Sequence, residues 1–447
     1  MNAYVAKVLN QLRDAQPWEK EFLQVVKEVL ESLGLVMDRE SKYKKHKVLE
    51  RLTIPERIVI FRVPWIDDSG EVQVNTGYRV QFNSAIGPYK GGLRFHPSVN
   101  LSVLKFLGFE QVFKNSLTGL PLGGAMGGSD FDPKGKSNNE VMRFCQNFMR
   151  ELFRHIGQDC DIPYGDIGVG LREIGYLFGQ YKMIANSVES VFTGKGASWG
   201  GTLVRAEATG YGCAYFAQEM LLASGKSLDG KKVMISGSGN VALCAAEKVA
   251  TLGGKVVSLS DSNGAVIDDA GITPEKIKFL RDLKMLRRGR LSEFADAFNG
   301  VKYFEGRHPW GLAKAEIVMP CATENELNKA DAAKLLENDC VCVVEGANMP
   351  STPDAIEYLI DHKILFGPCT AASAGGMAAS GLEMSQNAMR LSWPGEEVDK
   401  RLREIMSRIH ASCVQAAEEY GTPGNYVNGA NIAGFKKVAD AMIELGV

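Results

Sequence analysis

Three glycine-punctuated segments constrain this chain more than any other feature of its sequence. They are Gly87-Pro88-Tyr89-Lys90-Gly91-Gly92, the run from Pro121 to Asp130, and the run from Asp161 to Gly170. The middle segment has four glycines in the six positions from Gly123 to Gly128. Because glycine permits backbone geometries and close approaches that other residues resist, we expect Met126, the large side chain among them, to be displayed at a functional position.

A second type of glycine motif follows an apolar strand in the other half of the chain. Val233–Ser236 is the predicted strand, a helix comes next, and Lys255–Ser260 is a second strand. In such βαβ units Gly237 allows the tight turn, Gly239 lets the backbone approach a pyrophosphate, and Ala242 keeps the helix close to the sheet. The helix N-terminus also favours an anionic phosphate. We therefore predict a dinucleotide site formed by Gly237, Ser238, Gly239, Asn240 and Val241.

The end of the second strand carries the signal for cofactor preference. Asp261 stands where an acidic residue ordinarily accepts the ribose 2′-hydroxyl of NAD and repels the 2′-phosphate of NADP. Ser260 and Ser262, however, can donate to a phosphate, and Lys134 could add positive charge. From these residues alone, both cofactors stay open.

Composition excludes several classes of function. At roughly 150 residues per domain, 447 residues suggest two or three domains, and we expect two. The 51 basic and 53 acidic residues are spread without long runs of either sign, which indicates no nucleic-acid partner. No apolar run reaches the roughly 18 residues that a membrane span needs, so we expect no membrane partner. A small molecule is the expected partner.

Cysteine and histidine usage points to a reducing compartment without a structural metal. The nine cysteines include no C-x-x-C pair, which is typical of free thiols in a cytoplasmic protein. The first residues lack the basic and apolar stretches of a signal peptide. The six histidines have no H-E-x-x-H spacing, so we expect no metal site.

Hydrophobic periodicity predicts an α/β organisation. Apolar residues from Phe22 to Leu33 recur at helical spacing, which indicates an amphipathic helix. Two β-branched runs, Arg57–Val63 and Glu71–Phe82, flank Asp67-Asp68-Ser69-Gly70 and predict a hairpin. Further short strands are expected at Ile317–Met319, Cys340–Val344 and Ile364–Phe366. Their alternation with helical segments is typical of a doubly wound sheet.

Taken together, these motifs resemble the hexameric glutamate dehydrogenases of the Glu/Leu/Phe/Val dehydrogenase family. The resemblance covers nearly the whole chain, from the helix near Trp18 to the segment from Gly429 to Phe435. It implies a homohexamer in which an α/β substrate-binding and oligomerisation domain spans residues 1–200, with residues 425–447 folding back onto it. A Rossmann-type doubly wound domain would span residues 201–424.

The resemblance also implies an activity, reversible oxidative deamination of L-glutamate to 2-oxoglutarate and ammonia. The combination around Asp261 and Lys134 looks like that of NADP-preferring members, so we expect NADP, with NAD possible. Thr209 and Asn348 match family positions that approach the cofactor.

Substrate roles follow from the same resemblance. Lys90 with Ser380 matches the distal-carboxylate site, and Lys114 with Gln111 matches the α-carboxylate site for an amino or keto dicarboxylate. Asp166 matches the acid/base aspartate, which exchanges protons with the nitrogen intermediates. Two neighbouring residues are also expected in the substrate site, Tyr164 and Gly165.

Several positions depart from the family pattern. Met126 stands where the family has its catalytic lysine, and removing such a preorganised charge costs on the order of 10²- to 10⁴-fold in rate. Tyr164 replaces a usual alanine and Ala206 a usual proline. The family's lysine and asparagine are absent at Thr370 and Ser373.

Three functions are compatible with these departures. The first is a weakened glutamate dehydrogenase. The second is a dehydrogenase for another amino or keto acid, with Tyr164 reducing the pocket volume. The third is a catalytically poor regulatory protein that binds a dicarboxylate and a nucleotide.

Overall fold

The computed structural model describes residues 1–188 and 190–447 and divides the chain into two compact units. Unit 1 consists of Met1–Leu203, Ser380–Val398 and Asn431–Val447, and unit 2 consists of Val204–Ala379 and Asp399–Ala430. The chain therefore returns to unit 1 twice, whereas the sequence analysis expects only the final return.

Unit 1 opens with helices and continues with a five-stranded sheet flanked by helices. Its elements are α1 (Ala3–Ala15), α2 (Lys20–Arg39), α3 (Ser41–Lys45), α4 (Val48–Leu52), β1 (Arg57–Ile66), β2 (Val72–Asn83), β3 (Tyr89–Phe95), α5 (Leu101–Leu117), β4 (Gly124–Ser129), α6 (Asn138–Leu152), β5 (Asp161–Gly165) and α7 (Leu171–Ala185). Short 3-10 helices lie at Phe153–His155 and Ala197–Trp199. Three later helices have residues in both units, α15 (Gly375–Met389), α16 (Gly395–Glu419) and α17 (Tyr426–Leu445).

The sheet of unit 1 has the order β1-β2-β4-β3-β5. β1 and β2 form the predicted antiparallel hairpin, with Ile66 opposite Val72. β4 runs antiparallel to β2 and parallel to β3, and β3 runs parallel to β5. The sheet therefore brings β3, β4 and β5, the strands of the three glycine-punctuated segments, side by side.

The glycines of these strands allow close packing. A Cβ atom on Gly91 would lie 1.6 Å from the Ala125 carbonyl oxygen of β4. A Cβ atom on Gly124 would lie 2.3 Å from Val112 Cγ2 of α5. At both positions a larger residue would displace backbone or a packed helix, so these glycines serve the scaffold.

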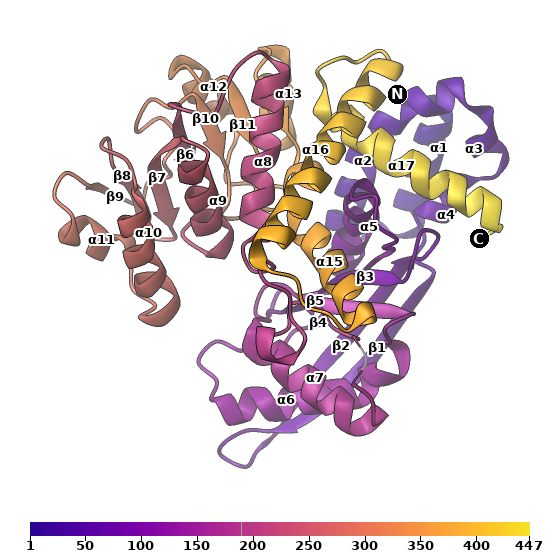
Figure 1. Ribbon diagram of the computed structural model, residues 1–447. Coiled ribbons are helices and arrows are strands. Elements are labelled where there is room, and N and C mark those ends of the chain that lie inside the picture. Colours follow the sequence, from indigo (N-terminus) through magenta and orange to yellow (C-terminus); the bar gives the residue numbers. More distant parts are fainter. Residues whose placement is uncertain (189) are drawn as a thin grey trace. The chain divides into compact units, whose positions relative to one another are not determined.

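Helices cover both faces of this sheet. Figure 1 shows α5 on one side and α6 with α7 on the other. One buried cluster joins Val63 and Trp65 of β1 to Phe95 of β3 and to Phe144 and Phe148 of α6. On the α5 side, the last segment of the chain is tied in, because Ser116 Oγ donates to the Gly434 carbonyl at 3.0 Å.

Unit 2 alternates strands and helices as the βαβ pattern predicts. Its elements are α8 (Ala208–Ala223), β6 (Lys232–Ile235), α9 (Asn240–Thr251), β7 (Lys255–Asp261), β8 (Gly264–Ile267), α10 (Pro274–Arg281), a π-helical turn η3 (Asp282–Leu286), α11 (Leu291–Ala297), β9 (Lys302–Glu305), β10 (Ile317–Met319), α12 (Lys329–Glu337), β11 (Cys342–Val344), α13 (Pro353–Asp361), β12 (Leu365–Gly367) and α14 (Cys369–Ala372). The expected short strands are thus present within one or two residues of their predicted bounds.

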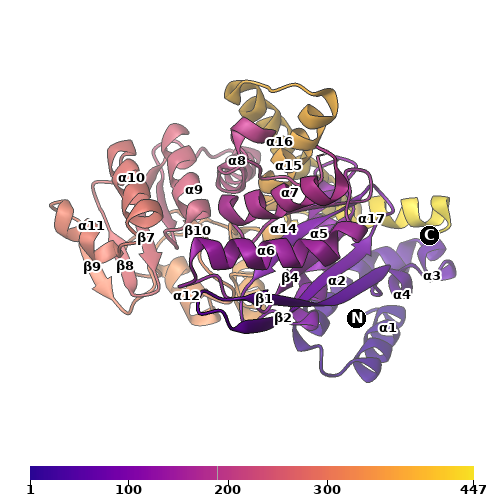
Figure 2. The same ribbon diagram turned by 90° about the horizontal axis from the view of Figure 1, so that it is seen from below.

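The sheet of unit 2 has the order β12-β11-β10-β6-β7-β8-β9. The pairs from β12 to β7 are parallel, and β8 and β9 add an antiparallel edge. Figure 2 shows α8, α9 and α10 on one side of the strands and α12 on the other. Helices on both faces of a mostly parallel sheet confirm the predicted doubly wound class.

Candidate active site

Predicted substrate-site residues meet around Gly92 on β3. Gly92 lies opposite Tyr164 of β5 in the strand register. A Cβ atom on Gly92 would lie 2.9 Å from Asp166 Cβ and 3.3 Å from both Met126 Sδ and Met126 Cε. The absence of a side chain at 92 therefore leaves room for the thioether and the carboxylate. Met126 itself is buried, with an exposed fraction of 2%.

Asp166 has a cationic partner that the sequence analysis does not identify. Arg94 Nε donates to Asp166 Oδ2 at 2.6 Å, and the Asp166 backbone N–H donates to the Leu93 carbonyl at 3.0 Å. The Asp166 side chain keeps 19% of its surface exposed. Lys90, Gly92 and Arg94 share one face of β3 because side chains alternate along a strand, and this spacing of two could have indicated Arg94.

Lys90 is fully buried and held by neighbours within unit 1. Its Nζ donates to the Ile162 carbonyl at 2.8 Å and to Thr193 Oγ1 at 2.6 Å. It also lies 4.8 Å from the centroid of the Tyr164 ring, within the range of a cation–π contact. Thr193 is a second residue that the sequence analysis misses, since nothing in its local sequence pairs it with Lys90.

A hydrogen-bonded chain connects Tyr164 to α5. The Tyr164 hydroxyl donates to Gln111 Oε1 at 3.0 Å, and Gln111 Nε2 donates to Asn115 Oδ1 at 2.7 Å. Asn115 Nδ2 then donates to the Lys90 backbone carbonyl at 3.0 Å. Gln111 and Tyr164, both predicted as substrate-site residues, thus lie in direct contact.

The remaining predicted substrate-site residues occupy neighbouring elements of unit 1. Lys114 follows Gln111 by one helical turn on α5 and is 8% exposed. Ser380 lies on α15 and is fully buried. A Cβ atom on Gly165 would lie 2.2 Å from the Val169 carbonyl oxygen, so this position serves backbone packing.

A buried ion pair holds the backbone of the two adjacent glycines of β3, Gly91 and Gly92. Arg79 of β2 donates to both carboxylate oxygens of Asp161 on β5, and its Nη1 donates to the Gly92 carbonyl at 2.9 Å. Gln81 Nε2 adds a hydrogen bond to Asp161 Oδ2 at 2.9 Å. Both charged side chains are fully buried. Arg79 therefore fixes β3 and β5 relative to β2.

A second buried network holds the loop that carries Thr193. Lys195 Nζ donates to Glu383 Oε1 and Asn387 Oδ1 of α15, both at 2.8 Å. Glu383 Oε2 accepts the Gly194 backbone N–H at 3.0 Å. Lys195 and Glu383 thus anchor the partner of Lys90 to the helix of Ser380.

The nucleotide turn of unit 2 has the geometry that its sequence predicts. Gly237 has a φ of +83°, and its N–H donates to Ser260 Oγ at 2.8 Å, which ties the turn to β7. A Cβ atom on Gly239 would have no heavy atom within 4 Å. The backbone there is open to a ligand, and α9 begins directly afterwards with no side-chain cap among the described residues.

The other residues of the nucleotide turn make contacts of different kinds. Ser238 is buried, and Asn240 Nδ2 donates to the Ala206 carbonyl at 2.5 Å. Val241 packs where α8 and α9 meet, because a Cβ atom on Gly210 would lie 2.5 Å from the Val241 carbonyl oxygen. The side chains therefore serve packing, and the backbone amides of the turn are the groups that fit a phosphate.

Asp261 at the end of β7 is surrounded by donors. Burial raises its pKa, but hydrogen bonds from the N–H groups of Asn263 and Leu291 and from Lys284 outweigh this and lower the pKa below its usual range. Lys284 Nζ lies 3.1 Å from Asp261 Oδ2. Arg290 Nη1 donates to Ser262 Oγ at 2.9 Å. Two cations therefore lie near Asp261 at this strand end, and Glu293 Oε1 accepts the Arg290 backbone N–H at 2.8 Å.

Other predicted cofactor residues lie at separate points. Thr209 is on α8, with its Oγ1 2.5 Å from where a Gly376 Cβ atom would be. Asn348 follows β11 and is half-buried. Lys134 lies in unit 1, in the exposed turn after β4. The altered residues Thr370 and Ser373 are both buried, at α14 and directly after it.

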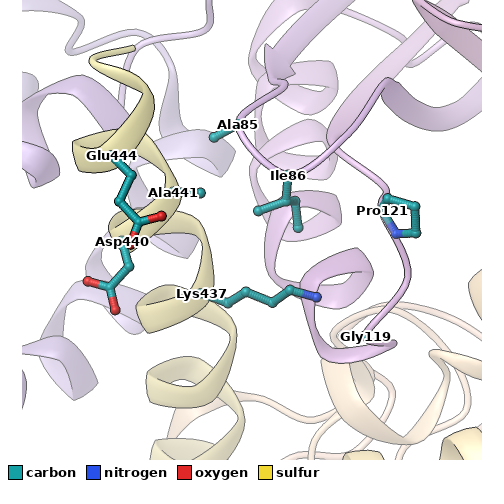
Figure 3. A pocket seen from close by; sticks show the side chains of 8 residues that line it. All are labelled: Ala85, Ile86, Gly119, Pro121, Lys437, Asp440, Ala441 and Glu444. Atoms are coloured by element: carbon teal, nitrogen blue, oxygen red, sulfur yellow. The ribbon is translucent and has the colours of Figure 1, made fainter.

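An open groove of about 440 Å³ in unit 1 contains none of these residues. Figure 3 shows Lys437 of α17 extending toward the segments that carry Ile86 and Gly119, while Asp440 and Glu444 lie on the same helix. Asp440 Oδ1 already accepts from Tyr43 and Lys42. With two carboxylates and one lysine, this groove does not fit a dicarboxylate ligand.

Several further findings concern the described residues as a set. Their helices include none that is both long and apolar enough to cross a membrane. They contain no group of three or more His, Cys, Asp or Glu side chains that could hold a metal ion. All nine cysteines lie in the described part of the chain as free thiols, and eight of them are buried, with Cys160 exposed.

Comparison with known proteins extends over nearly the whole chain. The family model described as Glutamate/Leucine/Phenylalanine/Valine dehydrogenase matches residues 200–446, and that of the dimerisation domain of the Glu/Leu/Phe/Val dehydrogenases matches residues 55–183. The NADP-specific glutamate dehydrogenase of Giardia intestinalis is 56% identical, covering 95% of each chain. The NAD-specific enzyme of Bacteroides fragilis is 54% identical, covering 99% of each chain. The crystal structure of Plasmodium falciparum glutamate dehydrogenase aligns with a TM-score of 0.97 at 51% identity, covering 99% of this chain and 94% of that one.

Proposed function

Because this chain belongs to the Glu/Leu/Phe/Val dehydrogenase family, we propose that it is an NADP-preferring oxidoreductase of the glutamate dehydrogenase type. Its reaction is the reversible oxidative deamination of L-glutamate to 2-oxoglutarate and ammonia, with a rate reduced by Met126. The similarity to glutamate dehydrogenases over at least 95% of the chain supports this reaction class. Fold alone would not, since one fold hosts many chemistries.

The observation that carries the proposal is the cluster around Gly92. Asp166 and Met126 approach the same point above β3, and Lys90 lies two residues earlier on the same face of that strand. Lys114 and Gln111 project from α5, which packs on β4. This arrangement supplies cations for two carboxylates and a carboxylate for proton transfer.

Each of these residues has a defined task in the proposed reaction. NADP, when bound, supplies the hydride acceptor. Lys114 with Gln111 binds the α-carboxylate, and Lys90 with Ser380 defines the distal end of the site. Asp166 exchanges protons with the substrate nitrogen and with water, while Arg94, 2.6 Å away, keeps its carboxylate in place.

Met126 removes one element of this chemistry. A thioether cannot stabilise the negative charge that develops on the carbonyl oxygen during amination, whereas a lysine ammonium can. The loss of a preorganised charge of this kind corresponds to roughly 3 to 5 kcal/mol of transition-state stabilisation. Arg94 does not replace the missing charge, because it is already engaged by Asp166.

The cofactor preference rests on the charges at the end of β7. Asp261 is occupied by Lys284 and by backbone N–H groups, so it is less available to a ribose 2′-hydroxyl. Arg290 adds a second cation beside Ser262. A 2′-phosphate would have Lys284 and Arg290 as cationic neighbours there, which favours NADP over NAD.

Assembly into a homohexamer is part of the same proposal. β1 is an edge strand, and the hairpin exposes apolar side chains on one face, including Ile60 at 56%, Val72 at 67% and Val74 at 60%. Exposed apolar edges of this kind are typical of association surfaces. Molar mass by light scattering distinguishes a hexamer from the 48.7 kDa single chain.

A cytoplasmic location completes the proposal. Nine free cysteines support a compartment that keeps thiols reduced. The small-molecule partner is an amino or keto dicarboxylate, with no nucleic acid and no membrane involved.

A second candidate function is favoured by a specific observation. Tyr164 covers Lys90 at 4.8 Å, which could redirect the site towards another amino or keto acid or leave a regulatory binder. In either case the nucleotide turn would still bind NADP, but glutamate would not be turned over.

The decisive experiment restores the charge at position 126. Purified protein is assayed by oxidation of NADPH and of NADH with 2-oxoglutarate and ammonia, beside the variants Met126→Lys and Met126→Leu. We expect Met126→Lys to raise kcat on the order of 10²- to 10⁴-fold. Met126→Leu is the matched control, because it has a similar volume and no charge. No gain in Met126→Lys would reject glutamate as the substrate.

A further inference from the structure

The ammonium of Lys90 is satisfied by the protein itself. Of its three donors, one goes to the Ile162 carbonyl at 2.8 Å and one to Thr193 Oγ1 at 2.6 Å. The Tyr164 ring lies over the same ammonium, 4.8 Å from Nζ to the ring centroid. The exposed fraction of Lys90 is 0%. A ligand carboxylate can therefore reach this lysine only if a neighbouring group moves away.

Tyr164 is the only large movable group among these three neighbours. Ile162 contributes a backbone carbonyl within β5, and Thr193 belongs to the loop that Lys195 and Glu383 anchor to α15. Tyr164 stands at the end of β5, where its side chain is only half-buried. It is therefore the residue that decides access to Lys90.

A hydrogen bond at its hydroxyl orients the Tyr164 ring. Its hydroxyl donates to Gln111 Oε1 at 3.0 Å, and that amide continues through Asn115 to the backbone carbonyl of Lys90. Opposite Tyr164 in the strand register is Gly92, which has no side chain to compete for the space. The ring therefore occupies the space that the side chain of a substrate would fill between Gln111 and Lys90.

We propose that Tyr164 is a specificity-determining residue whose ring takes the place of a substrate's distal carboxylate at Lys90. Short 2-oxo and 2-amino monocarboxylic acids, bound through the α-carboxylate at Lys114, then enter the site without moving the ring, so they form a second substrate class beside glutamate and 2-oxoglutarate. Dicarboxylates of the length of 2-oxoglutarate bind more weakly, because they must displace the ring and its hydrogen bond to Gln111. This inference rests on the proposed function for the α-carboxylate site and adds a second substrate class to it.

The test measures equilibrium binding, so that Met126 does not affect the result. Affinities for 2-oxoglutarate and 2-oxobutyrate are determined by calorimetry with saturating NADP for the wild type, Tyr164→Ala and Tyr164→Phe. We expect Tyr164→Ala to strengthen 2-oxoglutarate binding about 10- to 100-fold, in the range of pocket-shape discrimination, without strengthening 2-oxobutyrate binding. Tyr164→Phe keeps the ring but loses the hydrogen bond to Gln111, so it should strengthen 2-oxoglutarate binding less than Tyr164→Ala does and leave 2-oxobutyrate binding within about threefold of the wild type.

Several outcomes would overturn the inference. An unchanged ratio of the two affinities in Tyr164→Ala would do so, as would a Tyr164→Phe variant that behaves like the alanine variant. Failure of Tyr164→Ala to bind 2-oxoglutarate would also overturn it, because the opened Lys90 site should accept a carboxylate. Tyr164→Ser offers a second small side chain if the alanine variant does not fold.

Separate measurements test the proposed function, so that a failure of the dehydrogenase assignment can be distinguished from a failure of the role of Tyr164. Binding of NADPH and turnover by Met126→Lys test the dehydrogenase assignment whatever the residue at 164. Tight 2-oxoglutarate binding by the wild type would overturn the role of Tyr164 and leave the assignment standing.

Discussion

Glycine-rich segments are used differently in the two units of this chain. In unit 2 the turn at Gly239 leaves open space beside the backbone, and the groups suited to a ligand are main-chain amides. In unit 1 Gly91 and Gly124 are filled on all sides by β4 and α5, and the groups suited to a ligand are the side chains of Lys90, Lys114 and Asp166. A backbone site survives most side-chain substitutions, whereas a side-chain site can change its chemistry in one step.

Met126 shows that the fold tolerates a substitution that changes the chemistry of the site. It is 2% exposed in a fully buried strand, and an unbranched thioether adapts to irregular space in a core. The glycines around it keep β3, β4 and α5 in place whatever residue occupies 126. The fold can therefore remain intact while the chemistry of the site changes.

The largest effect is expected from adding a methyl group at Gly91. A Cβ atom there would lie 1.6 Å from the Ala125 carbonyl, which neither strand can avoid without shifting. We expect Gly91→Ala to lower the free energy of unfolding by more than about 4 kcal/mol and to abolish soluble expression. Thermal unfolding and soluble yield measure this effect.

Gly239→Ala is the matched substitution in unit 2. With no heavy atom within 4 Å of the added Cβ and a φ of −80°, we expect stability to change by less than about 1 kcal/mol. NADPH binding should weaken more than about tenfold, because the methyl group occupies the approach of the pyrophosphate. Equal destabilisation by the two glycine substitutions would remove the distinction between the units.

The next largest effect concerns two buried carboxyl groups, one in each unit. Asp161 of unit 1 is paired with Arg79, whereas Glu326 of unit 2 accepts from neutral donors, the Ser236 hydroxyl and the backbone N–H groups of Ala322 and Thr323. Burial raises the pKa of Glu326 to about 7. Its unfolded pKa is about 4.3, so the folded state keeps a proton that the unfolded state releases, and stability falls as pH rises from about 4.5 through 7.

Glu326→Gln should remove this dependence. Above pH 7 the variant should be more stable than the wild type by on the order of 3 to 4 kcal/mol, and below pH 4.5 the two should converge. Unfolding followed at pH 5, 6, 7 and 8 measures the slope, with exposed Glu337→Gln of α12 as the control. Part of the pH dependence of the free energy of unfolding should remain in the variant, because burial also raises the pKa of Glu345 to about 7. An unchanged slope in Glu326→Gln would refute this account.

The smallest effect concerns the charged side chains at the end of β7 in unit 2, which we expect to contact the cofactor. Lys284→Met removes one cation beside Asp261, so we expect NADPH affinity to fall about tenfold relative to NADH, or about 1.4 kcal/mol. Lys276→Met is the control, since Lys276 has the same 15% side-chain exposure and also pairs with an aspartate, Asp268. Fluorescence titration with both cofactors gives the ratio, and equal losses for NADPH and NADH would argue against a phosphate contact.

Local patterns predicted much of the fold. The periodicity from Phe22 to Leu33 predicted α2, and the turn at Asp67 to Gly70 predicted the β1–β2 hairpin. The glycine turn after Val233–Ser236 predicted the βαβ unit. Each signal depends on residues close together in the chain, where spacing alone determines the structure.

Non-local pairings could not be predicted in the same way. The contacts of Arg94 with Asp166, Lys90 with Thr193 and Arg79 with Asp161 join residues at least 72 positions apart. Their existence depends on the strand order β1-β2-β4-β3-β5, for which single-sequence patterns carry no signal. The roles assigned to the site residues remain predictions, while the positions of these partners define which variants test them.

The interrupted composition of unit 1 has a consequence for its biosynthesis. Residues 431–447 belong to it, and Asn431 Nδ2 donates to Ser32 Oγ of α2 at 3.1 Å. A ribosome adding roughly 5 to 20 residues per second needs about 12 to 50 s to proceed from residue 203 to residue 447. During that interval the apolar surface that α17 later covers is not yet covered by this helix. Unit 1 is therefore complete only once the final segment has left the exit tunnel, and early termination would leave the first half of the polypeptide without part of its core.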